Sequence, residues 1–89
     1  MTSKEFDIQL SALRTMLLTK EQGNIPKEQW NGFVHIATQC MRDAFRDGES
    51  GSGATADLIA TMETAHNPLA EAIASAMRWS YTQGQKARI

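Results

Sequence analysis

Several features that direct a chain to a particular class of protein are scarce in this one. It has a single cysteine, which excludes a disulfide framework and a zinc site built from cysteines. Nine basic residues stand against ten acidic ones, a formal net charge of −1. This balance lacks the one-sign excess that marks a strongly basic nucleic-acid binder or an acidic DNA mimic. No apolar run approaches the roughly 18 residues of a transmembrane helix, so no membrane contact is expected.

The remaining absences concern location and size. Charged residues at Lys4, Glu5 and Asp7 interrupt any signal-peptide core, and the sequence therefore predicts a cytoplasmic protein. A length of 89 residues predicts one domain. Such a chain buries a little over ~60% of its unfolded surface, so its core is small.

Strand-forming patterns are also missing. Valine occurs once, at Val34, and no stretch alternates β-branched with polar residues. Leu, Ile, Val and Phe total only 16 residues, but 12 Ala and 5 Met add to them, and the apolar positions recur at helical spacing. The near-zero net charge argues against disorder. The composition therefore predicts an alanine-rich helical protein.

Two helices are predicted in the N-terminal half, over residues 3–22 and 26–47. Thr2 and Glu5 have the spacing of a capping box, and Pro26 suits a helix start. The first helix carries an apolar stripe of Phe6, Leu10, Leu13 and Leu17. The second carries an arc of Trp30, Phe33, Val34, Ala37, Cys40, Met41, Ala44 and Phe45. A Gly/Ser-rich segment follows at 48–53, where we expect a flexible loop within the single domain.

Two further helices are predicted over residues 55–66 and 68–83. Asn67-Pro68 separates them, because a residue before proline avoids the helical region while Asn and Pro suit the next helix start. Gly84 is expected to end the fourth helix. The expected fold is all-α, a compact four-helix bundle-like domain.

No catalytic constellation follows from these placements. His35 has no acid, histidine or cysteine three or four residues away, and we expect a solvated side chain. His66 stands at a helix end, where a cation is favourable. Cys40 belongs to the apolar arc and is interpreted as a small core residue. The glycines of 48–53 lack the Lys-Ser/Thr that follows a phosphate loop. We expect no enzyme activity, cofactor or metal.

The predicted fourth helix has an unusually wide apolar arc of about 220°, where a surface helix needs roughly 100°. Such a helix is either central in the monomer or covered by a second subunit. We expect the second arrangement, a homodimer or partner interface formed by the apolar and aromatic side chains of this helix: Leu69, Ala70, Ile73, Ala74, Met77, Trp79 and Tyr81.

Three functions are compatible with this pattern. The leading hypothesis is a small non-enzymatic regulator or adaptor that binds a protein partner, such as a transcription factor or an enzyme, and that is itself a homodimer. The alternative is a nucleic-acid-associated regulator that uses the aromatic and basic segment Arg78–Tyr81 with Lys86 and Arg88. A third is a small-molecule pocket between helices, lined by Met41, Met62, Met77 and Trp30.

Overall fold

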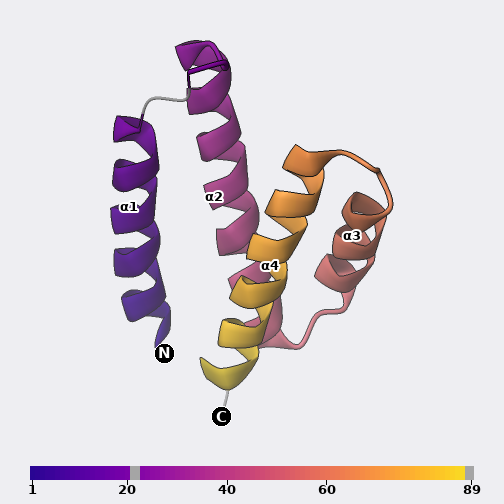
Figure 1. The fold of residues 1–89 in the computed structure, drawn as a ribbon. Helices are drawn as coiled ribbons and strands as arrows, with labels where there is room; N and C mark the ends of the chain where they lie inside the picture. The colour runs from indigo at the N-terminus through magenta and orange to yellow at the C-terminus, as the bar shows by residue number, and fades with distance from the viewer. Residues whose placement is uncertain (21–22, 88–89) are drawn as a thin grey trace.

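The computed structural model describes residues 1–20 and 23–87, and within these ranges the chain is all-α. Its four helices are α1 (Ser3–Thr19), α2 (Lys27–Ser50), α3 (Ala54–Glu63) and α4 (Pro68–Ala87). Figure 1 shows α2 and α4 crossing at the centre, with α1 against α2 and α3 against α4. The prediction of an all-α, four-helix bundle-like domain is confirmed.

The helices form a flattened assembly in the order α1, α2, α4, α3. The Cα trace measures 42 × 30 × 13 Å, so it is much thinner in one direction than in the other two. The outer helices α1 and α3 pack mainly on α2 and α4, respectively, whereas α4 lies between α2 and α3. This central position covers most of the wide apolar arc of α4 within the chain itself.

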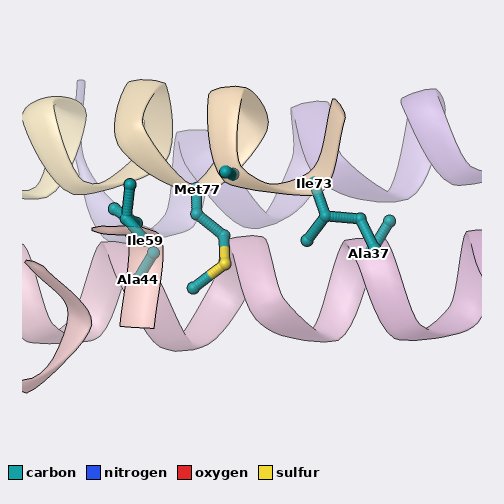
Figure 2. Packing of buried hydrophobic residues seen from close by; sticks show 6 residues of the cluster. Ala37, Ala44, Ile59, Ile73 and Met77 are labelled. Carbon is teal, nitrogen blue, oxygen red and sulfur yellow. The ribbon is translucent and has the colours of Figure 1, made fainter. Parts of the chain in front are cut away.

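The main core lies where α4 packs on α2. Ile73 and Met77 project from α4 toward Ala37 and Ala44 of α2, as Figure 2 shows, and Ile59 of α3 closes the cluster. The small alanine side chains let the helices approach closely, and the long side chains of α4 fill the space between them. A second cluster contains Phe6, Leu10, Met41 and Phe45, and it holds α1 on α2.

Two glycines mark the point where α2 and α4 come closest. A Cβ on Gly84 would collide with the carbonyl oxygen of Phe45 and lie 3.0 Å from the amide nitrogen of Glu49. A Cβ on Gly48 would collide with the carbonyl oxygen of Tyr81 and lie 3.1 Å from the Cα of Gly84. Both glycines are buried inside helices. The two backbones therefore touch, which only residues without a side chain permit.

This contact corrects two of the predicted helix ends. Gly84 was expected to end the fourth helix at residue 83, but α4 continues through it to Ala87. The second helix was expected to end at residue 47, but α2 continues to Ser50, and Gly51 ends it with a φ of 78°. Glycine is a common helix terminator in sequence, and here tertiary packing outweighs its low helix propensity.

The loop predicted over residues 48–53 is therefore shorter in the structure. Its first three residues belong to α2, and only Gly51–Gly53 connect α2 to α3. Residues in and beside this loop are anchored by hydrogen bonds. The Tyr81 hydroxyl donates to the Ser52 carbonyl at 2.9 Å, and the Thr55 hydroxyl donates to the Asp47 carboxylate. The flexibility expected for this loop stays a prediction, now confined to residues 51–53.

The predicted helix starts are confirmed at their caps. The hydroxyl oxygen of Thr2 accepts from the Glu5 amide at 3.1 Å, and the Asn67 side chain accepts from the Leu69 amide at 2.9 Å. Pro26 is the N-cap of α2. The first helix ends at Thr19 rather than at residue 22, and residues 21 and 22 lie outside the described part of the chain.

The third helix ends at Glu63, three residues before the predicted end, and His66 then turns the chain back with a φ of 53°. This left-handed conformation costs a non-glycine residue about 1–2 kcal/mol. Replacing the exposed His66 by glycine is therefore expected to raise the free energy of unfolding by about 0.5–1 kcal/mol, once the greater freedom of glycine in the unfolded chain is subtracted.

Urea denaturation measures this change. The matched control is His35→Gly, the same substitution at an exposed position inside α2, which is expected to lower stability by a few tenths of a kcal/mol. Destabilisation by both substitutions would contradict the strain assigned to His66.

Candidate functional site

The strongest candidate site is an apolar groove between α1, α2 and α4. It holds about 150 Å³ and is lined by Phe6, Gln9, Leu10 and Leu13 of α1, Met41 of α2 and Trp79 of α4. An apolar cavity of this volume accommodates a group as large as benzene. The groove therefore has room for one apolar side chain of a bound partner.

Packing around Phe6 builds the groove. The Phe6 ring is buried and stacks on Phe45 of α2, with the ring centroids 4.2 Å apart and the planes 15° from parallel. The Trp79 ring lies 6.1 Å from Phe6 at a tilt of 32°, so it forms the α4 side of the groove. The far end of α1 is held by Trp30, whose Nε1 donates to the Leu17 carbonyl at 2.8 Å. The walls are thus fixed by side chains of three helices.

Exposed apolar side chains lie on the elements that form this groove. Trp79 is 44% exposed, and on α1 Ile8 and Met16 are 62% and 50% exposed. Tryptophan has a large apolar surface, and its exposure at a groove is typical of an interface anchor. Other large apolar residues with exposed side chains are Ile36, Leu58 and Leu69.

The structure does not assemble the seven predicted interface residues on one surface. Ile73, Ala74 and Met77 are buried in the core between α4, α2 and α3, and Ala70 and Tyr81 are partly buried. Only Leu69 and Trp79 are exposed. The reason is the central position of α4: most of its apolar arc faces this chain's own helices. Of the two aromatic residues, Tyr81 is bonded to the α2–α3 loop and Trp79 faces outward.

Sequence reasoning missed the groove residues on α1 and α2. Phe6, Leu13 and Met41 were assigned to apolar stripes facing the core. Helical periodicity does not distinguish a residue of the core from one that lines a groove. The sequence carries no signal that separates them: of the four stripe residues on α1, Phe6 and Leu10 are buried, whereas Leu13 and Leu17 are half-buried.

The predicted chemistry-bearing residues do not form a catalytic cluster in the described ranges. His35 is exposed, as expected, and so is His66. Cys40 is partly buried against the main core cluster, in agreement with its interpretation as a packing residue. Among residues 1–20 and 23–87, no group of three His, Cys, Asp or Glu side chains is arranged to hold a metal ion.

Burial raises the pKa of the Cys40 thiol, and the nearby Asp43 carboxylate raises it further. Since the thiolate is the reactive form, Cys40 of the folded protein is expected to react several-fold more slowly with an aromatic disulfide reagent than in the urea-unfolded chain. Stopped-flow labelling at pH 7.5 measures the two rates. Equal or faster labelling of the folded protein would contradict this account of Cys40.

The fold does not bring the residues of the predicted small-molecule pocket together. Met41 lines the groove, Met62 and Met77 belong to the main core, and Trp30 lines a separate depression near the α1–α2 connection. The proposed small-molecule pocket is therefore divided among different regions. In the aromatic and basic segment, Arg78 forms an ion pair with Glu63 of α3. Residue 88 lies outside the described ranges.

None of the helices described here is both long and apolar enough to cross a membrane. A scan against protein-family models and searches of curated proteins and of solved structures find no match to this chain.

Proposed function

We propose that this chain is a small non-enzymatic adaptor or regulator that binds another protein through the groove beside Trp79. The observation that carries the proposal is the position of Trp79, half exposed at the edge of a groove walled by buried apolar side chains. Fully burying one large apolar side chain is favourable by about 1.5–3 kcal/mol, from which the entropic cost of association is subtracted. Tryptophan is also enriched among residues whose truncation weakens interfaces strongly.

The geometry favours a helical segment as the bound element. The groove lies between two helices and is floored by a third, and an amphipathic helix inserts its apolar residues into grooves of this kind. We further propose that a second copy of this chain occupies the groove, because Met16 is exposed on α1 one turn beyond Leu13, which lines the groove. Two-fold pairing would cover both grooves at once.

Sedimentation velocity over a micromolar concentration series tests the homodimer. The wild type is expected to show a concentration-dependent dimer, and Trp79→Ala to raise the dissociation constant about tenfold or more. Leu58→Ala is the matched control, since Leu58 is similarly exposed but lies on α3, outside the groove. A wild type that stays monomeric throughout would contradict the homodimer.

A pull-down from the source cells with the same three proteins tests the broader proposal. A specific protein partner is expected to be retained by the wild type and by Leu58→Ala and lost with Trp79→Ala. Equal retention by all three would contradict docking at the groove. If nucleic acid is recovered instead, a gel shift that weakens steeply with salt would support the alternative regulator function.

A further inference from the structure

A second, smaller pocket lies between α1 and α2 and is polar. It holds about 80 Å³. Arg14 and Ser11 line it from α1, while His35, Gln39 and Arg42 line it from α2. Sequence reasoning treated His35 as isolated because it searched only along α2. The structure supplies its neighbours from α1.

Residue spacing explains how the pocket acquires its charge. Asp7 and Arg14 are seven residues apart on α1, and His35 and Arg42 are seven apart on α2, so each pair lies on one helix face about two turns apart. The Arg42 Nε lies 3.6 Å from the Asp7 carboxylate, which joins the helices at one end. Because the helices run antiparallel, the other end brings Arg14 toward His35.

The pocket lining is unbalanced in charge. It contains the Arg14 and Arg42 guanidiniums and the His35 imidazole but no carboxylate. Asp7, which lies outside the lining, faces Arg42 and offsets part of this charge. A guanidinium presents five N–H donors that match the oxygens of phosphate and carboxylate groups. An anion placed here would offset the positive charge that the two helices bring together.

The hydrogen bonds identify which groups can contact such an anion. The Thr38 hydroxyl donates to the Val34 carbonyl at 2.9 Å, so Thr38 contributes no donor. The Gln39 amide donates to Asp43 at 3.4 Å, outside the pocket lining. The groups left to donate are the Arg14 and Arg42 guanidiniums, the His35 ring and the Ser11 hydroxyl. They come from both helices and converge on one small volume.

We infer that this pocket binds a small tetrahedral oxyanion of the phosphate type. Its volume suits one such group, and donors from two helices can reach different oxygens of a tetrahedral ion. A planar carboxylate presents only two oxygens and is expected to bind more weakly. This site shares Leu10 with the groove beside Trp79 but none of its polar residues, so variants of those polar residues test it independently.

Titration with inorganic phosphate at constant ionic strength, followed by amide NMR, tests the inference. Saturable shifts are expected at Ser11, Arg14 and His35. Arg14→Gln is expected to weaken binding on the order of three- to fivefold, the range for exposed charge pairs. Arg46→Gln removes the same charge one turn beyond Arg42, outside the pocket lining, and is expected to leave the affinity within about twofold.

Asp7→Asn provides a test in the opposite direction. It removes the carboxylate that holds Arg42, and the affinity for phosphate is expected to rise on the order of two- to fivefold. A rise cannot come from damage to the fold. The inference would be overturned if the shifts did not saturate, or if Arg14→Gln and Arg46→Gln weakened binding equally. It would also be overturned if Asp7→Asn lowered the affinity, or if acetate bound as tightly as phosphate.

Discussion

Gly84→Ala is expected to destabilise this protein by about 1–2 kcal/mol. The new methyl group would collide with the Phe45 carbonyl and press on the Glu49 amide, and both are backbone atoms of a helix that cannot rotate away. Overpacking a fixed contact typically costs 1–3 kcal/mol, and alanine recovers only about 1 kcal/mol of helix propensity. Since α2 and α4 form the central contact of a small core, this loss is a large fraction of the total stability. Thermal denaturation by circular dichroism measures it.

Gly32→Ala is the matched control for this prediction. Gly32 is exposed within α2, and no atom lies within 4 Å of the position of a new Cβ. The same substitution is therefore expected to stabilise the protein by up to about 1 kcal/mol through helix propensity alone. Gly48→Ala is expected to resemble Gly84→Ala. If all three changes stabilise the protein, the close crossing of α2 and α4 is wrong.

The second large effect is expected at Phe6. Truncating a buried phenylalanine to alanine typically costs 3–5 kcal/mol, and Phe6 loses its stacking on Phe45 as well. Because α1 buries only Phe6 and Leu10 fully, most of this cost falls on the attachment of α1 rather than on the contact between α2 and α4. Phe6→Ala is therefore expected to release α1 while the other three helices stay folded.

Native-state hydrogen exchange distinguishes local release from global unfolding. Amides of α1 are expected to lose protection in Phe6→Ala, whereas amides around Ala44 and Met77 keep theirs. Ile8→Ala is the control, since Ile8 lies on α1 with its side chain mostly exposed. Uniform loss of protection across all four helices in Phe6→Ala would contradict the separate attachment of α1.

Local signals in the sequence determined much of this fold. The helix starts at Thr2, Pro26 and Asn67 were predictable because capping depends on residues within one turn of the start. The ends of α2 at Ser50 and of α4 at Ala87 were not, because a glycine such as Gly48 or Gly84 can either terminate a helix or permit a close helix crossing. Nothing within either helix indicates that the two glycines meet.

The candidate site was predicted only in part for a related reason. Trp79 was identified from the wide apolar arc of α4, but Ile73 and Met77 carry the same periodic signal and belong to the core. Periodicity shows which residues share a face and does not show which helix covers that face. The cationic pocket was invisible along the chain, because Arg14 and His35 come together only when α1 folds back on α2.

Fluorine NMR on protein labelled with 5-fluorotryptophan tests most directly whether the groove beside Trp79 is a protein-binding surface. The chain has two tryptophans, and Trp30 is held by its bond to Leu17, so it serves as an internal reference. The Trp79 signal, assigned with Trp79→Phe, is expected to shift as protein concentration or a captured partner is increased, while the Trp30 signal stays in place. The proposed function would be contradicted if the Trp79 signal stayed unchanged both when the protein concentration is raised and when a captured partner is added.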